Sequence, residues 1–255
     1  MLYIVALGII FAILGTAWVF DYFLSHTLQE NSALCIGLSS GVFTVVVIHL
    51  IVNMGHNTSN VTETTFWVLG GVLVMALLFR LPFFHNHEPA STTNKGTARQ
   101  TLWSDALHNM SDGVLLTSVF TTESDMRLFV IIGIVIHEIL MTNAQFTKLR
   151  IAGYSTRHMI GLSAISASSI FVGVIGGTYM LQTFQDALII LLSLTIGGFT
   201  MVVLHDMGIF AKKKPLSITK IIGFCIGASF MIGIQFYTPH EHIHDHHVAK
   251  HTKDI

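Results

Sequence analysis

The chain has 255 residues, of which 52% are hydrophobic and only 11% are charged. Soluble domains carry about 25% charged residues, so this composition excludes an ordinary soluble enzyme, and it is far too apolar for a disordered chain. The formal net charge of −1 excludes a strongly basic nucleic-acid-binding protein. The long uncharged runs that recur along the chain indicate instead a protein that crosses a membrane several times.

Eight hydrophobic runs are each close to the ~20 residues that a helix needs to cross a bilayer. Backbone groups in lipid must hydrogen-bond within their own segment, so runs of this length predict helices. The first run starts at Leu2 with no basic residues before it and no cleavage signal after it, which predicts a retained span. We therefore predict an all-α polytopic membrane protein, with one transmembrane domain over residues 1–255. The predicted helices cover residues 3–24, 33–53, 65–81, 102–120, 127–147, 159–181, 186–210 and 217–237.

The positions of Lys and Arg predict how these helices are oriented. Ten of the 13 basic residues fall on the side of the membrane that holds the stretch 82–99, and three fall on the side that holds both termini. By the positive-inside rule the side with ten basic residues is cytoplasmic. We therefore expect both termini on the opposite, outer side of a plasma or inner membrane.

Two polar stretches lie outside the predicted spans. Residues 82–99 form a predicted cytoplasmic loop that contains His85 and His87, and residues 239–255 form a predicted tail outside the membrane. The tail has five histidines between positions 240 and 247, and tracts of this kind bind zinc, nickel or copper. We therefore favour metal capture by the tail over an inert polar tail.

The run 102–120 carries polar groups that a purely structural membrane helix does not need. A charged side chain at the bilayer centre costs roughly 2.5–3.5 kcal/mol, so such groups indicate function. His108 and Asp112 are four residues apart and therefore share one face of the predicted helix. Asp105 and Asn109 have the same spacing, so nitrogen and oxygen ligands recur along this helix about one turn apart.

The run 127–147 places His137 and Glu138 at its centre, after nine residues without charge. Imidazole nitrogen and carboxylate oxygen together suit zinc, iron and manganese. Such groups on two facing helices can replace the hydration shell of a divalent cation that crosses the membrane. A proton relay, or hydrogen bonding between helices, is the alternative for any one of these residues. Taken together, the histidines and carboxylates of the two runs favour a metal site.

Two motifs in these runs resemble those of the ZIP family of metal transporters. The string from His108 to Gly113, HNMSDG, resembles the HNxxDG motif of that family's fourth helix. The tripeptide from His137 to Ile139, HEI, resembles the start of the HEIPHE motif of its fifth helix. Weaker similarities at residues 41–49, 152–155 and 197–207 extend the resemblance over nearly the whole chain.

The resemblance implies a function and a set of metal ligands. It implies transport of a divalent metal cation, zinc first among them, toward the cytoplasm by a homodimer whose helix groups move in an elevator-like or rocking manner. It also implies a binuclear site between the fourth and fifth helices. His108, Asp112 and His137 match the first metal site of the family, and Asn109 and Glu138 match the second.

The chain departs from the family pattern after the HEI tripeptide. Leu140, Met141 and Thr142 stand where the family has proline, a further ligand and glutamate. A bridging ligand is therefore missing, which leaves open a single-metal carrier or a different metal preference. Without the proline, the fifth helix is expected to be straighter.

Other functions fit some of the same residues. A zinc protease of the HExxH kind needs a second histidine where Met141 stands, so that enzyme is excluded, and only an intramembrane hydrolase with scattered ligands stays conceivable. The missing ligands also fit a metal sensor or an inactive member of the family. We favour a carrier over both, and we expect no enzymatic activity. No nucleotide-binding motif is present, so transport driven by ATP through this chain is not expected.

Overall fold

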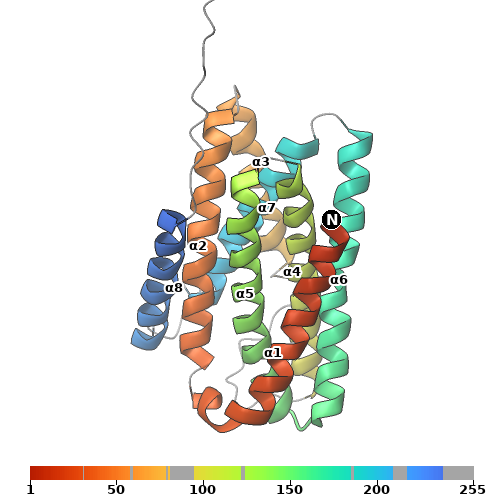
Figure 1. The fold of residues 1–255 in the computed structure, drawn as a ribbon, viewed down its shortest axis with the longest axis vertical. Helices are drawn as coiled ribbons and strands as arrows, with labels where there is room; N and C mark the ends of the chain where they lie inside the picture. Colours follow the sequence, from red (N-terminus) through yellow and green to blue (C-terminus); the bar gives the residue numbers. More distant parts are fainter. Residues whose placement is uncertain are drawn as a thin grey trace, which may run out of the picture.

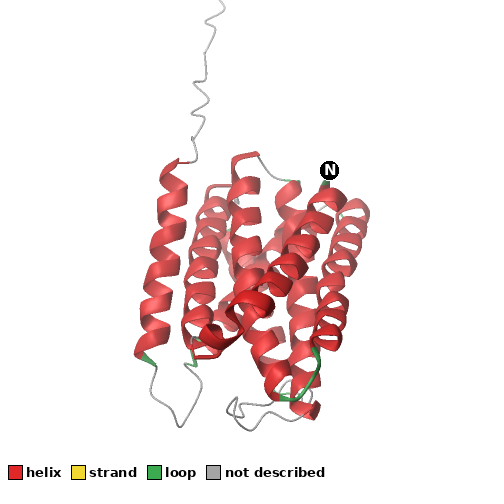
Figure 2. Cartoon of the chain, turned by 60° about the horizontal axis from the view of Figure 1, so that its bottom comes forward, coloured by secondary structure: helices red, strands yellow, loops and turns green. Residues whose placement is uncertain are grey.

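The computed structural model describes residues 1–30, 32–57, 60–78, 80, 95–121, 124–184, 187–208 and 217–237. Every regular element within these ranges is an α-helix, and eight helices are present there (Figures 1 and 2). The prediction of an all-α fold is therefore confirmed for this part of the chain. The helices are α1 (Leu2–Glu30), α2 (Ser32–Asn57), α3 (Val61–Leu78), α4 (Lys95–Phe120), α5 (Ser124–Ile151), α6 (Thr156–Thr183), α7 (Ala187–Asp206) and α8 (Ile218–Tyr237).

Six of the eight helices are long and apolar enough to cross a membrane, judged over the described residues: α2, α3, α5, α6, α7 and α8. In α1 the apolar stretch Leu2–Thr16 is shorter than a membrane-spanning helix. Helix α4 is not among the six, because Asp105, His108, Asn109 and Asp112 lower its apolarity. The fold therefore agrees with a multi-span protein, and the polar residues that single out α4 are those that the sequence marks as functional.

Helix α4 also begins earlier than the sequence predicts. It starts at Lys95, whereas the predicted span starts at residue 102 and the predicted loop runs to residue 99. The reason is that residues 95–101 are polar, and hydropathy detects only the part of a helix that lipid could surround. The predicted loop and helix α4 therefore overlap at residues 95–99. The remaining residues of the loop and the His-rich tail at 239–255 lie outside the described residues.

Three helix pairs pack most extensively, namely α2 with α8, α4 with α6, and α3 with α7. Glycines lie at each of these crossings. In the second pair, a Cβ atom on Gly113 of α4 would collide with backbone atoms of α6, and one on Gly173 of α6 would collide with the backbone of α4. Small residues at such crossings let two membrane helices approach closely and gain van der Waals contact. Close backbone packing therefore fixes α4, which carries most of the candidate ligands.

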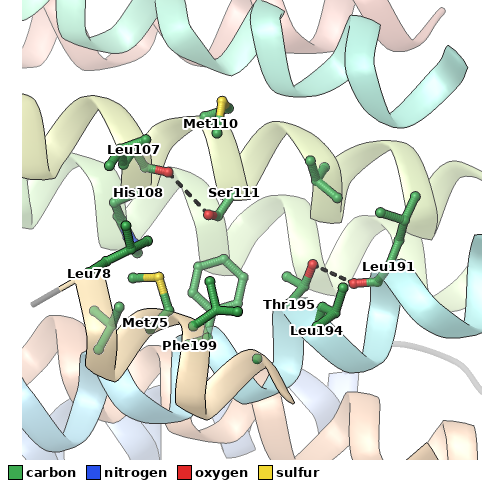
Figure 3. Close-up of a pocket in the computed structure, with 15 residues that line it drawn as sticks. Met75, Leu78, Leu107, His108, Met110, Ser111, Leu191, Leu194, Thr195 and Phe199 are labelled. Atoms are coloured by element: carbon green, nitrogen blue, oxygen red, sulfur yellow. Dashed lines mark hydrogen bonds between the residues drawn. The ribbon is translucent and has the colours of Figure 1, made fainter. Parts of the chain in front are cut away.

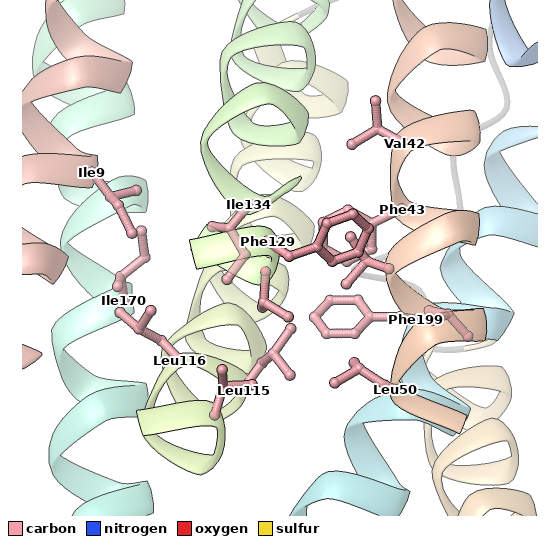
Figure 4. Packing of buried hydrophobic residues seen from close by; sticks show 14 of the residues in the cluster. Ile9, Val42, Phe43, Leu50, Leu115, Leu116, Phe129, Ile134, Ile170 and Phe199 are labelled. Atoms are coloured by element: carbon pink, nitrogen blue, oxygen red, sulfur yellow. The ribbon is translucent and has the colours of Figure 1, made fainter. Parts of the chain in front are cut away.

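The largest hydrophobic cluster lies where α2, α4, α5 and α7 meet, and α1 and α6 extend it (Figure 4). Phe43, Leu115, Phe129 and Phe199 in this cluster are each at most 2% exposed. Large apolar side chains also remain exposed on the outer helices, including Leu69 of α3. An apolar surface of this kind suits contact with lipid.

Candidate metal site

Two neighbouring helices bring three metal-ligating side chains together inside the bundle. Nε2 of His108 on α4 lies 2.6 Å from Nε2 of His137 on α5. Oε1 of Glu138 lies 3.8 Å from the first of these nitrogens and 3.9 Å from the second. One ligand atom from each of the three residues fits within 4.8 Å of the others. Since all three residues are buried, this cluster is shielded from bulk water.

Asp112 adds a second carboxylate beside this cluster. It lies one turn after His108 on α4, and its Oδ2 atom is 3.9 Å from His108 Nε2. Both oxygens of Asp112 and Oε1 of Glu138 are buried and accept no hydrogen bond from a donor in the described part of the chain. Burying a carboxylate without a donor or counter-charge is costly. A cation bound among these four side chains would compensate that cost.

The two imidazoles are closer to each other than two ligands of one metal ion would be. At 2.6 Å their Nε2 atoms can share one proton in an N–H···N hydrogen bond. Zinc–nitrogen bonds of about 2.0–2.1 Å at a tetrahedral angle separate two ligand nitrogens by about 3.3 Å. A cation bound to both nitrogens would therefore need the rings to move apart slightly, and it would take the place of the shared proton.

Asn109 belongs to a different polar network from the histidine pair. Its Nδ2 donates to Oδ2 of Asp105 and to Oγ of Ser166, at 3.3 Å in each case. The same Asp105 oxygen accepts from Ser166 Oγ at 2.5 Å and from Gln145 Nε2 at 3.1 Å. In the structure Glu138 lies with His108 and His137, and Asn109 lies with Asp105. The division of these residues between two metal ions stays a prediction. Only Oδ1 of Asn109, which is buried without a donor, remains available to a ligand.

Two phenylalanines and a serine enclose the histidine pair, and none of the three is among the predicted site residues. Phe43 of α2 lies with its ring centroid 3.9 Å from that of His137, and Phe199 of α7 lies 5.4 Å from that of His108. Oγ of Ser39, also on α2, is 2.6 Å from Nδ1 of His137. The sequence alone does not predict this contact, because Ser39 and His137 are 98 positions apart.

A cavity of about 250 Å³ reaches His108 from the side where α3, α4 and α7 meet (Figure 3). Its walls are mostly apolar, and they include Met75 and Phe199. The hydroxyls of Ser111 and Thr195 in its lining donate to carbonyl oxygens of their own helices, at 3.1 and 2.7 Å. The cavity therefore offers a cation few ligands other than His108.

Other polar residues of the predicted spans lie outside the cluster. His49 of α2 contacts Gln235 of α8 at 3.2 Å and stacks near Phe129. His205 and Asp206 pair with each other at the end of α7, with Nδ1 and Oδ1 3.5 Å apart.

The divergent end of the fifth-helix motif offers neither an imidazole nor a carboxylate to the cluster. Met141 carries a thioether and Thr142 a hydroxyl. Helix α5 runs without a break from Ser124 to Ile151, in agreement with the absence of proline at position 140.

Fold and site together describe an all-helical protein, with helices long enough to span a membrane and a buried group of histidines and carboxylates. The curated proteins similar to part of this chain include zinc transporter ZIP6 of Pongo abelii and zinc transporter ZIP6 of Homo sapiens, each 28% identical over 103 residues. Each match covers 40% of this chain and 14% of the relative, so the chain spans a small part of the length of these proteins. No protein-family model matches the chain. These similarities relate part of the chain to proteins named as zinc transporters.

Proposed function

We propose that the protein carries a divalent metal cation across a membrane toward the cytoplasm, with zinc as the first candidate. The substrate binds between α4 and α5, held by His108, His137, Asp112 and Glu138. Two imidazole nitrogens and two carboxylates are a ligand set that suits zinc. Membership of the ZIP family, to which the motifs of α4 and α5 are similar, is part of this proposal.

One observation carries the proposal, namely the buried carboxylate oxygens that have no hydrogen-bond donor. Asp112 and Glu138 face two imidazoles and no Lys or Arg among the described ion pairs. Burying such oxygens is costly, and a cation bound between the two carboxyl groups and the imidazoles would offset that cost. The four side chains replace the water that the cation loses on leaving bulk solvent.

The direction of transport and the orientation in the membrane belong to the same proposal. All eight helices cross the bilayer, both termini lie outside, and the basic ends of the helices lie in the cytoplasm. The basic end of α5, with Lys148 and Arg150 in its last turn, marks the cytoplasmic side. The homodimer that the family resemblance implies remains a prediction, and none of the contacts described above depends on it.

Uptake into liposomes tests the proposed transport. Purified protein is reconstituted, and the accumulation of Zn²⁺, Fe²⁺, Mn²⁺ and Cd²⁺ is followed with time. We expect saturable Zn²⁺ flux that His108→Ala abolishes, because the variant removes the nitrogen closest to the other ligands. His158→Ala is the matched control, since His158 is exposed in the first turn of α6 and bonds only to Ser155 in the described contacts. Equal flux in the wild type and in His108→Ala would refute the site.

A metal sensor or inactive carrier is the second candidate, and the hydrogen bonds of Asn109 favour it. The two hydrogen bonds from its amide to Asp105 and Ser166 leave one oxygen for a second metal ion, and Met141 and Thr142 offer neither an imidazole nor a carboxylate. This candidate predicts that Zn²⁺ stabilises the protein against heat in a manner that needs His108, while no flux is detected. Flux would exclude it.

A further inference from the structure

The side chain of Ser39 contacts the Nδ1 side of the His137 ring, opposite the side that faces the metal-ligand cluster. Its Oγ atom lies 2.6 Å from Nδ1 of His137, while the Nε2 atom of the same ring faces His108 and Glu138. Ser39 is fully buried, at 0% exposure, so water does not compete for this contact. Ser39 therefore engages the Nδ1 side of the ring, and Nε2 is the ring nitrogen that faces the cluster.

The tautomer of His137 follows from this contact. A neutral imidazole carries one N–H, and the nitrogen without it is the one that binds metal. If Ser39 Oγ accepts a hydrogen bond from Nδ1–H, then Nε2 has a free lone pair directed at the site. A ligating histidine usually donates its other N–H to an acceptor in this way, which fixes the ring and strengthens the metal bond.

Helix α2 contacts His137 a second time, one turn further along. Phe43 lies four residues after Ser39, and its ring lies 3.9 Å from the ring of His137, centroid to centroid, at an angle of 42°. Since residues four apart share a helix face, Ser39 and Phe43 reach the same imidazole from one side of α2. The hydroxyl orients the ring in its plane, and the phenyl ring limits its tilt.

We propose that Ser39 is a positioning residue for the metal site: it accepts the Nδ1–H of His137 and keeps Nε2 available to the cation. This inference rests on the proposed function, because it assigns a role at the same site. It adds helix α2 to a site whose ligands all come from α4 and α5. When a cation binds Nε2, it withdraws electron density from the ring and makes Nδ1–H a stronger donor, so binding tightens the contact between α2 and α5.

The test compares three variants of the full chain in lipid nanodiscs. Ser39→Ala removes the acceptor, Ser39→Thr keeps a hydroxyl at the same position, and Ser40→Ala is the matched control. Ser40 is the next residue on α2, is 2% exposed, and its hydroxyl has no partner among the described residues. Zn²⁺ affinity is measured by competition with a chelating dye, and the absorption spectrum of bound Co²⁺ reports the geometry of its ligands.

We expect Ser39→Ala to weaken Zn²⁺ binding by about 10–100-fold and to change the Co²⁺ spectrum, because loss of an outer hydrogen-bond partner has this effect at metal sites. Ser39→Thr is expected to restore most of the affinity, and Ser40→Ala to bind as the wild type does. Wild-type affinity in Ser39→Ala would overturn the inference. An equal loss in Ser40→Ala would also overturn it, since the effect would then come from the packing of α2.

The same measurements separate this inference from the proposed function. If wild-type protein binds no Zn²⁺ and shows no flux, the proposed function is refuted, and the inference is refuted with it because it depends on that function. If the wild type binds Zn²⁺ and needs His108 to do so, while Ser39→Ala is indistinguishable from it, only the inference fails. Thermal unfolding without metal, compared between Ser39→Ala and the wild type, checks that the fold is retained.

Discussion

Glu138 shows how a single side chain can serve binding at a cost to the metal-free fold. It is 1% exposed, and its Oε1 atom lies within 4 Å of two imidazole nitrogens without accepting a hydrogen bond. The carboxyl group of Asp112 is a further neighbour, close enough for the two groups to share one proton. Two neighbouring buried carboxyl groups, with no Lys or Arg among the described ion pairs, form an arrangement that a cation would stabilise.

The variant Glu138→Gln is predicted to change metal binding and stability in opposite directions. Its amide keeps the size of the side chain, removes the charge and supplies an N–H donor to Asp112, so the metal-free protein should be more stable by about 1–2 kcal/mol. Stabilisation by Zn²⁺ should be lost. Thermal unfolding with and without Zn²⁺ measures both effects, and Glu63→Gln, at an exposed position, is the control. A less stable metal-free variant that Zn²⁺ still stabilises would contradict the prediction.

At the scale of residues, the sequence predicts those members of the site that are close together in the chain. The pairs His108–Asp112 and His137–Glu138 follow from helical spacing and from the cost of polar groups in lipid. The sequence does not predict the role of Ser39, because nothing local distinguishes this serine from Ser40 beside it. Its contact with His137 depends on how α2 packs against α5, and that packing is set by the bundle as a whole.

The crossing of α4 and α6 shows how the packing of an element controls the position of a site. Met110, whose backbone lies against Gly173, is two residues from His108 on α4. Any group that pushes the two backbones apart therefore also displaces the imidazole of His108 from its partner on α5.

The substitution Gly173→Ala is predicted to disturb both stability and metal binding. Its methyl group would collide with the Met110 carbonyl and with Gly113, and overpacking of this kind costs about 1–3 kcal/mol. Gly176→Ala is the matched control on the same helix, because a Cβ atom there meets nothing within 4 Å. Thermal unfolding and Zn²⁺ affinity of the two variants are compared. The prediction is wrong if Gly173→Ala behaves as Gly176→Ala does.

The helices were predicted well where an apolar run defines them, and their bounds were predicted less well where polar residues extend the helix. All eight predicted runs correspond to helices in the described residues, since an apolar run of membrane length has little alternative to a helix. The start of α4 was missed because its first turns, from Lys95, are polar. The short distance between Glu138 and His108 does not follow from the sequence, because side-chain direction around a helix depends on the neighbouring helices.

For the whole molecule, the orientation in the membrane is the prediction that the distribution of basic residues makes most directly. A cysteine at position 63, in the first turn of α3, should lie outside, and a cysteine at position 157, at the start of α6, should lie in the cytoplasm. Both positions are exposed.

Labelling with an impermeant maleimide in intact cells tests this orientation. Glu63→Cys and Arg157→Cys are made in a Cys225→Ser background, because Cys225 is exposed whereas Cys35 is buried. We expect Glu63→Cys to react and Arg157→Cys to react only after the membrane is permeabilised. The opposite pattern would reverse the proposed direction of transport.

The polar composition of α4 has a consequence for how the protein is made. During synthesis the insertion machinery meets Asp105, His108 and Asp112 long before any cation does, and each charged residue at a helix centre opposes entry into lipid by roughly 2.5–3.5 kcal/mol. If α4 spans the membrane as proposed, its insertion depends on its partners, above all on the glycine-packed α6, which emerges from the ribosome later. We therefore expect α4 to enter lipid stably only once α6 has been made, so the proposed ligands would also slow the assembly of the protein.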